Sequence, residues 1–312
     1  MAKSILSAPR FHDEEAARTH LEALRWPNGA ECPHCGGTER NTQLQGKAHR
    51  PGLWTCGDCR TQFSVTVGTV FERSKIPLHK WLLVTHLMCA SKKGMSAKQI
   101  ERMLGVTYKT AWFMCHRVRE AMKPMGFEKL GSGGGTVEAD ETYFGTSKDA
   151  LADLKRRKKK KASGHHKMKI VSLVERGGDV RSFHVDKITG LTLREKLMTH
   201  VDKSAHLMTD EATFYKQTGK QFASHEVVTH SKYEYVRGEA YTNTVESYFA
   251  LLKRGLIGTF HHVGEQHLFR YMHEFDFRYN NRKVEDAERS DNALKGISGK
   301  RLTYRRIDQV QA

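Results

Sequence analysis

The sequence lacks any long hydrophobic run. No stretch approaches the roughly 20 consecutive apolar residues that a helix needs to cross a bilayer. The first ten residues, from Met1 to Arg10, also lack the apolar segment typical of a secretory signal. These two absences argue against a membrane or exported protein, and we therefore expect a protein of the cytosol that does not bind membranes.

Acidic residues are few relative to basic ones. The 312 residues include 35 Asp and Glu against 52 Lys and Arg, which gives a formal net charge of +17. This balance predicts a polyanionic partner, with nucleic acid favoured over an anionic membrane. A basic protein that is merely soluble is the alternative, but the charge is clustered. The length allows two or three domains with at least one sizeable core.

Cysteine is also scarce, and four of the six cysteines form two CxxC pairs separated by twenty residues: Cys32, Cys35, Cys56 and Cys59. In a reducing compartment such pairs indicate a metal rather than disulfides. The spacing fits a tetrahedral four-thiolate zinc site, with Gly36 and Gly57 permitting tight turns at the two knuckles. Two redox pairs are the alternative, but no βαβ pattern surrounds them. The remaining thiols, Cys89 and Cys115, are expected to be buried and structural.

Four helices are expected before residue 125. Apolar periodicity and capping residues predict helices over 11–26, 77–90, 96–104 and 107–122, with Asp13, Ser96 and Thr107 as caps. Between the first two, Phe63, Val65 and Val67 alternate with polar residues and predict a strand over 62–71 with a bend at Gly68.

The last two of these helices are joined by a short glycine turn. This arrangement favours a helix-turn-helix, although an ordinary three-helix packing module has the same pattern. The outward face of the last helix is expected to offer polar side chains to DNA, chiefly Lys109 and Arg117, with Tyr108, Thr110 and His116 beside them.

A flexible linker, Gly131–Gly135, separates this region from a second one. There the pattern predicts strands over 136–144, 169–174, 180–185, 205–209 and 226–229, and helices over 192–201, 242–254 and 267–279. The order of these elements predicts an α/β fold with a mixed sheet flanked by helices. The polar residues after about 281 are assigned no fold.

Three acids stand in contexts that suit metal-dependent phosphodiester chemistry. Asp140 and Asp210 lie at or beyond the ends of expected strands, and Glu246 lies on the helix over 242–254. Two magnesium ions held by such carboxylates stabilise charge on both the attacking and the leaving oxygens. Lys253 lies two turns after Glu246 on the same helical face.

The choice among neighbouring acids stays open at this level. Glu138 and Glu141 compete with Asp140, and Glu211 competes with Asp210, because a strand-ending acid is more often a turn residue than a ligand. Three histidines, His206, His261 and His262, are possible neighbours of the site, but solvated or packed roles are favoured for them.

A run of seven consecutive positive charges spans Lys155–Lys161. Such a block repels itself. Phosphate contact through Lys155, Arg156, Arg157 and Lys158 is the favoured interpretation, because it would supply affinity without sequence recognition. A solvated loop is the alternative.

Several motifs, in order, resemble one family. These are the two CxxC pairs, Gln62-Phe-Ser-Val-Thr-Val-Gly-Thr-Val-Phe71, Val137-Glu-Ala-Asp-Glu-Thr-Tyr-Phe-Gly145, Thr209-Asp-Glu211, Asn243-Thr-Val-Glu-Ser-Tyr-Phe249 with Leu252-Lys-Arg254, and Phe275-Asp-Phe-Arg-Tyr-Asn280. Their order and spacing are similar to those of the zinc-ribbon DDE transposases of bacterial insertion sequences, the ISXO-like group. The matches run over most of residues 25–285.

This resemblance implies an RNase H-like catalytic core in which Asp140, Asp210 and Glu246 are the D-D-E ligands of two Mg²⁺ (or Mn²⁺) ions. The thirty-five residues between Asp210 and Glu246 match the spacing common in such enzymes. Lys253, followed by Arg254, matches a basic position that contacts transposon-end DNA. The intact Glu246 favours a competent enzyme over a relic that only binds DNA.

The resulting domain prediction comprises an N-terminal helix (1–26), a zinc ribbon (27–71), a helix-turn-helix domain (76–125), a linker (126–135), an RNase H-like catalytic domain (136–285) and a polar tail (286–312). The predicted function is a DNA transposase of the bacterial cytoplasm, associated with the nucleoid. It would bind terminal inverted repeats, cleave a strand and join the freed 3′-hydroxyl to target DNA, as a homodimer or larger homo-oligomer. The alternatives are a DNA-binding regulator and an RNase H-like nuclease without joining activity.

Overall fold

The computed structural model describes residues 4–124, 126, 128–147, 152, 167–228, 236–237 and 240–303. The chain forms two compact units. The terminal unit consists of Met1–Lys123 and Lys283–Ala312, and the central unit consists of Pro124–Arg282. Across the described residues, no helix combines the length and the apolar character that membrane crossing requires.

Helices in the terminal unit begin where capping residues were predicted. The helices are α1 (Glu14–Arg25), α2 (Leu78–Ala90), α3 (Ala97–Leu104) and α4 (Tyr108–Ala121). Asp13, Ser96 and Thr107 each accept a hydrogen bond from a backbone N–H in the first turn of the next helix, which satisfies one of its otherwise unpaired donors. Gly105 ends α3 in the left-handed conformation, with φ of 63°. The predicted helices are therefore confirmed.

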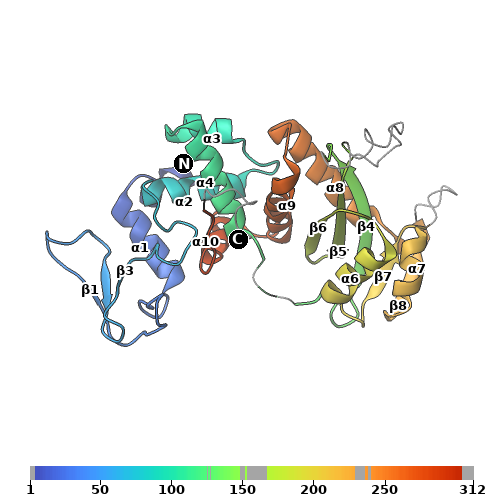
Figure 1. Ribbon diagram of the computed structural model, residues 1–312, viewed down its shortest axis with the longest axis horizontal. Coiled ribbons are helices and arrows are strands. Elements are labelled where there is room, and N and C mark those ends of the chain that lie inside the picture. Colours follow the sequence, from blue (N-terminus) through green and yellow to red (C-terminus); the bar gives the residue numbers. More distant parts are fainter. Residues whose placement is uncertain are drawn as a thin grey trace. The chain divides into compact units, whose positions relative to one another are not determined.

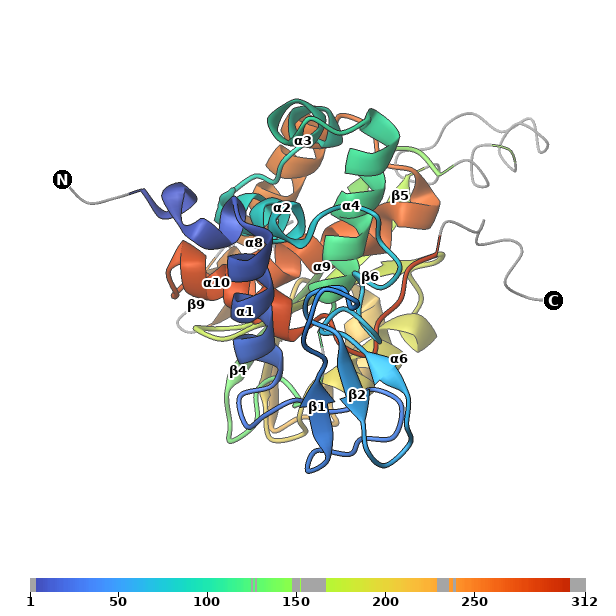
Figure 2. The ribbon, with the colours of Figure 1, turned by 90° about the vertical axis from the view of Figure 1, so that its left-hand side faces the viewer.

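The zinc-ribbon region is a small antiparallel sheet (Figure 2) made of β1 (Asn41–Gln43), β2 (Trp54–Cys56) and β3 (Gln62–Phe63). The predicted strand over 62–71 is wrong beyond Phe63. Phe63 and Val65 are buried as their alternation indicates, but residues 65–68 form turns. The alternation of apolar and polar residues therefore indicated which of these side chains are buried, but it did not indicate strand pairing.

The chain after residue 285, to which the sequence assigned no fold, contributes a helix to the terminal unit. Helix α10 (Asp286–Lys295) packs against α2, with Ala293 and Leu294 buried. Asp291 accepts a hydrogen bond from His20 at 2.9 Å, and Arg289 donates to the carbonyl of Cys89 at 3.2 Å. The helix was missed because its sequence is polar, and its stability depends on packing rather than on local pattern.

The central unit is built on one five-stranded sheet in the order β6-β5-β4-β7-β8 (Figure 1). The strands are β4 (Thr136–Phe144), β5 (Met168–Glu175), β6 (Val180–Val185), β7 (His206–Thr209) and β8 (Ser224–Val227). β4 pairs antiparallel with β5 and parallel with β7, and β7 pairs parallel with β8. The predicted α/β class with a mixed sheet is confirmed, and the RNase H-like assignment stays a prediction.

Helices cover both faces of this sheet. One face packs on α8 (Asn243–Gly255) and α9 (Glu265–Asn280), in a core that contains Phe144, Ile170, Phe249 and Phe275. The other face packs on α6 (Gly190–His200), in a core that contains Ala139, Leu193 and Leu207. Because successive side chains of a strand point to opposite faces, the α8 face receives Glu138 and Asp140 of β4, while the α6 face receives Glu141.

Short elements complete the two units. They are η1 (Ile5–Ser7) and η2 (Pro9–Phe11) in the terminal unit, and η3 (Thr213–Tyr215), α7 (Lys216–Gly219), β9 (Val236–Arg237), β10 (Ala240–Tyr241) and the π-helical turn η5 (Leu256–Phe260) in the central unit. The η5 turn continues α8 directly.

Candidate active site and zinc centre

The four predicted zinc ligands lie together in the ribbon. All four sulfur atoms are within 4.8 Å of one another. Cys32 and Cys59 are 3.7 Å apart, and Cys35 and Cys56 are 3.6 Å apart. Sulfurs placed about 2.3 Å from a tetrahedral zinc ion lie about 3.8 Å from one another, so the cluster fits one structural zinc.

Glycines make the two cysteine knuckles possible. Gly36 has φ of 76°, in the left-handed region that favours glycine. A Cβ on Gly57 would lie 2.8 Å from the carbonyl oxygen of Arg40, which accepts a hydrogen bond from the Gly57 N–H at 2.6 Å. The ribbon therefore closes around the cysteines only if these turns stay free of side chains.

The parallel pairing of β4 and β7 brings the first two candidate acids together. Ala139 is in register with Thr209, and the next residues along the two strands are Asp140 and Asp210. β7 ends at Thr209, whereas β4 continues to Phe144, so Asp140 lies within its strand and not at the end as predicted. Both carboxylates nevertheless lie at the edge of the sheet where β7 ends. Asp210 is fixed further because its Oδ1 accepts a hydrogen bond from the N–H of Ala212 at 3.0 Å.

Glu246 reaches this edge from α8. It lies in the first turn of that helix, where the macrodipole favours a negative charge. Its side chain is exposed, and its Oε1 accepts a hydrogen bond from the hydroxyl of Thr242 at 3.1 Å. Val245 and Phe249 pack into the core on the α8 face of the sheet, as predicted, so the position of the helix determines the position of Glu246.

The charges of the other two acids contribute to a raised pKa of Asp140. Burial, with the neighbouring carboxylates of Glu141, Asp210 and Glu246, raises the pKa of Asp140 from 3.8 to about 7. A hydrogen bond at 2.7 Å from the N–H of Glu141 acts in the opposite direction. A cation bound beside Asp140 would remove this repulsion and favour the ionised carboxylate.

Glu141, a competitor of Asp140 in the sequence, points to the other face. It accepts a hydrogen bond at 2.6 Å from the hydroxyl of Tyr215, which is fully buried among the residues that pack against α6. Burial raises the pKa of Glu141, the Tyr215 hydrogen bond lowers it, and the charge of Asp210 raises it again. No sequence signal pointed to Tyr215, because the contact joins residues 74 positions apart.

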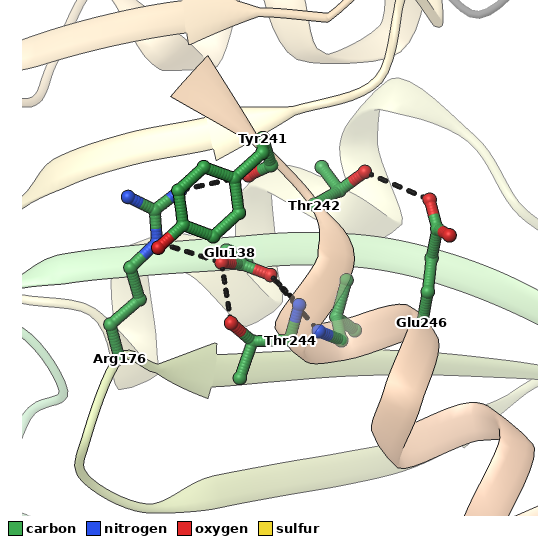
Figure 3. Close-up of polar contacts among 7 residues, drawn as sticks. Glu138, Arg176, Tyr241, Thr242, Thr244 and Glu246 are labelled. Atoms are coloured by element: carbon green, nitrogen blue, oxygen red, sulfur yellow. Dashed lines mark hydrogen bonds and ion pairs between the residues drawn. The ribbon is translucent and has the colours of Figure 1, made fainter. Parts of the chain in front are cut away.

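Glu138, the other competitor, is not part of the open edge. Its side chain is completely buried and bonds to Arg176 and to the first residues of α8 (Figure 3). Sequence alternation places Glu138 and Asp140 on the same face of β4 and does not separate their roles. The separation comes from the packing of α8, which a single sequence does not display.

The carboxylates of Asp140, Asp210 and Glu246 are ligands that suit magnesium or manganese. Carboxylate oxygens are the ligands that these ions prefer, and two ions roughly 3.5–4 Å apart need a wider set of ligands than one zinc ion. Among the described residues, only the cysteines bring three or more ligand atoms within 4.8 Å of one another. Asp140, Asp210 and Glu246 therefore do not form a group of ligand atoms that all lie within 4.8 Å of one another in this structure.

The predicted DNA-binding residues differ in exposure. Lys109 and Arg254 are exposed, and Lys253 is half-buried on α8, roughly 10 Å along the helix axis from Glu246. Arg117 is half-buried, and its guanidinium lies over the ring of Phe113 and donates to the carbonyl of Glu72 at 3.3 Å. The basic run that contains Lys155, Arg156, Arg157 and Lys158 lies outside the described residues.

The histidines do not gather at the acids. His116 is buried and not on the outward face of α4. His206 begins β7, four residues before Asp210, and hydrogen-bonds to Ser224 at 2.7 Å. His261 and His262 follow η5, and His261 is separated from Glu246 by roughly 20 Å of helix.

Comparison with known proteins identifies both parts of the chain. Residues 133–280 match the ISXO2-like transposase domain, and residues 12–62 match the transposase zinc-ribbon domain. An uncharacterised protein in transposable element ISH50 of Halobacterium salinarum is 27% identical over 280 residues, which cover 86% of this chain and 91% of that protein.

The two family matches and the four-cysteine cluster identify a transposase of the DDE class with a zinc ribbon. The two matching domains span more than half of the sequence, and the chain belongs to the family of zinc-ribbon ISXO2-like transposases.

Proposed function

We propose that this transposase binds the ends of its element, cleaves a DNA strand and joins the freed 3′-hydroxyl to target DNA. The observation that carries the proposal is the register of β4 and β7, which brings Asp140 beside Asp210, and the charge of Glu246 on α8 contributes to the raised pKa of Asp140. The membership of the chain in a DDE transposase family supports the same reaction class.

Each acid has a role that follows from its position. Asp140 and Asp210 would hold divalent metal ions where β7 ends beside β4, and Glu246 would complete the set from the helix. Two bound Mg²⁺ or Mn²⁺ ions would supply Lewis-acid stabilisation of charge on the attacking and leaving oxygens of the phosphodiester. Lys253 and Arg254 would orient the DNA backbone beside the acids through contacts to phosphate.

Two ends of an element must be brought together for its transfer. We therefore propose that the chain acts as a homodimer or larger homo-oligomer on terminal inverted repeats and target DNA. The net charge of +17 supplies the attraction to the polyanion.

The function is tested with a labelled duplex made from the DNA that flanks this reading frame. With Mg²⁺ or Mn²⁺, the protein should cut at the element end and join that end to a target plasmid, while Asp210→Ala should do neither. Asp202→Ala replaces a half-buried aspartate of the same unit, and this matched control should retain both activities. Cleavage without joining would indicate a nuclease, and undiminished activity of Asp210→Ala would refute the proposed site.

We propose a binding surface for DNA on the terminal unit, consistent with the helix-turn-helix prediction for α3 and α4. A cavity of about 380 Å³ lies between residues 73–76 and the first half of α4. Four cationic residues line it beside Trp81 and Phe113, namely Arg73, Lys75, Lys109 and Arg117. Arg73 and Lys109 are exposed and are placed to meet phosphate, and Arg73 also pairs with Glu72 at 3.6 Å. Arg117 donates to the carbonyl of Glu72.

Removing a phosphate contact should weaken DNA binding and its dependence on salt. For Lys109→Ala we expect a weaker affinity for all duplexes, and a slope of log K against log salt that is smaller by about one. Fluorescence anisotropy between low and physiological salt measures both. Lys196→Ala, a lysine on α6 paired with Glu195 at 2.9 Å, removes the same charge and should leave the slope unchanged. Equal slopes for the two variants would contradict the proposal that α4 contacts DNA.

A further inference from the structure

Glu138 is a charged side chain in the interior of the central unit. It lies on β4 two residues before Asp140, on the same face of the sheet, and none of it is exposed. A carboxylate in such a place is strongly destabilising unless charged or hydrogen-bonding partners surround it. Its partners therefore indicate why it is there.

Three of these partners belong to the first turn of α8. The Glu138 Oε2 atom accepts hydrogen bonds from the N–H of Thr244 at 2.8 Å and of Val245 at 2.9 Å. The hydroxyl of Thr244 donates to Oε1 at 2.8 Å. The first N–H groups of a helix have no partner within it, and Thr242 at the cap position makes no side-chain cap. Glu138 thus caps α8 from a neighbouring strand.

Arg176 compensates the charge and holds the chain that enters the helix. Its Nε lies 2.7 Å from Glu138 Oε1, and its Nη2 donates to the carbonyl of Tyr241 at 2.9 Å. The guanidinium also lies over the ring of Tyr241, 3.5 Å from the ring centroid (Figure 3). Residues 241–245 are therefore fixed to β4 through one buried ion pair.

We propose that Glu138 is a positioning residue that sets Glu246 against Asp140 by anchoring the N-terminus of α8 to the strand that carries Asp140. The inference rests on the proposed function of these acids. Glu246 follows the anchored N–H of Val245 by one residue, about 1.5 Å along the helix axis. The anchor therefore acts at the point of the helix nearest to the metal ligand.

The side chain of Glu246 is exposed, so its position depends on the anchored first turn of α8. Its carboxylate bonds to Thr242, which belongs to the same anchored segment. A shift of the first turn moves Glu246 and Thr242 together, and the spacing of a metal site tolerates little movement. Residues that orient metal ligands commonly alter metal affinity by 10–100-fold when they are replaced.

The test is Glu138→Gln in the full-length, zinc-loaded protein. Glutamine keeps the shape and one acceptor oxygen but loses the ion pair with Arg176. We expect the Mn²⁺ concentration for half-saturation to rise about tenfold. Electron paramagnetic resonance of free Mn²⁺ measures this binding without any reaction. Cleavage should fall at limiting Mn²⁺ and recover largely at saturating Mn²⁺.

The matched control is Glu274→Gln. Glu274 is equally buried in the same unit and is paired with Arg278 within α9. Its loss should lower stability to a similar degree without changing the Mn²⁺ half-saturation. A role of Glu138 in stability alone would make the two variants alike in Mn²⁺ binding, and that result would overturn the inference.

Two further variants keep the result decisive. Thr244→Val removes a single hydrogen bond to Glu138 and should shift Mn²⁺ binding in the same direction by a smaller factor, so it decides the question if Glu138→Gln fails to fold. Glu246→Gln tests the proposed function itself. If Glu246→Gln leaves Mn²⁺ binding and cleavage intact, the proposed site fails. If it impairs them while Glu138→Gln and Thr244→Val both match Glu274→Gln, only the positioning role fails.

Discussion

Replacing Asp140 by asparagine is expected to stabilise the metal-free protein while it abolishes metal-dependent strand cleavage. Burial and three neighbouring carboxylates raise the pKa of Asp140 to about 7, so its ionised form is unfavourable in the folded state. Asparagine removes that charge and keeps an oxygen that can accept the hydrogen bond from the Glu141 N–H. The loss of a metal ligand should cost roughly a thousandfold or more in cleavage rate, since metal ions supply several kcal/mol of transition-state stabilisation.

The gain in stability should depend on pH. Below pH 3.8 the carboxyl is protonated in both states and the substitution removes no charge. Between pH 3.8 and about 7 the unfolded chain releases this proton and the folded chain retains it, so the wild-type protein loses stability as pH rises. At about 1.4 kcal/mol per pKa unit, the difference amounts to roughly 4 kcal/mol at most. Above pH 7 the gap between variant and wild type should stay constant.

Thermal unfolding of the zinc-loaded protein, in buffer without added Mg²⁺ or Mn²⁺, would measure this effect at pH 5 and pH 8. Asp202→Asn is the control of opposite sign, because hydrogen bonds from Ser204 lower the pKa of Asp202 and its charge is favourable in the fold. If the difference in Tm between Asp140→Asn and the wild-type protein were equal at both pH values, that result would contradict the burial of this charge.

Removing zinc is expected to unfold the ribbon and abolish specific binding to DNA ends. Its strands contain three, three and two residues, too few to be stable without further support. A structural zinc ion contributes about 10–16 kcal/mol of apparent binding energy in zinc-finger peptides, so its loss should exceed the stability of the ribbon. The central unit has its own cores and should remain folded.

Cys32→Ser tests this expectation against Cys89→Ser, which alters a buried thiol outside the cluster. Zinc content should fall in the first variant and stay at one ion per chain in the second. Hydrogen exchange should become fast over residues 41–63 in Cys32→Ser, while β4 and β5 remain protected. A Cys32→Ser protein that retains zinc and a protected ribbon would contradict a site built from all four thiolates.

Elements with local signals were predictable from the sequence. The caps at Asp13, Ser96 and Thr107 act within one turn of the residues they stabilise, so a sequence pattern suffices to find them. The cysteine cluster was equally predictable, because the spacing of its ligands can be read directly from the sequence. The five strands of the central sheet followed from apolar runs between turn residues.

Features that depend on distant partners were not predictable. Val65 and Val67 alternate like strand residues, but no strand pairs with them. Arg117 has the position of a DNA contact on its helix, yet burial lowers its pKa and it serves the packing of the unit. Glu138 and Asp140 have the same local pattern, and only the first turn of α8 distinguishes them.

The packing of α10 on α2 also determines when, during synthesis, the terminal unit can complete its fold. A ribosome completes residues 1–123 first, then the whole central unit, and only afterwards the helix over Asp286–Lys295 that packs on α2. The terminal unit therefore reaches its final packing after the catalytic chain has been synthesised. A chain released before residue 286 lacks α10, so its terminal unit is left without the helix that packs on α2.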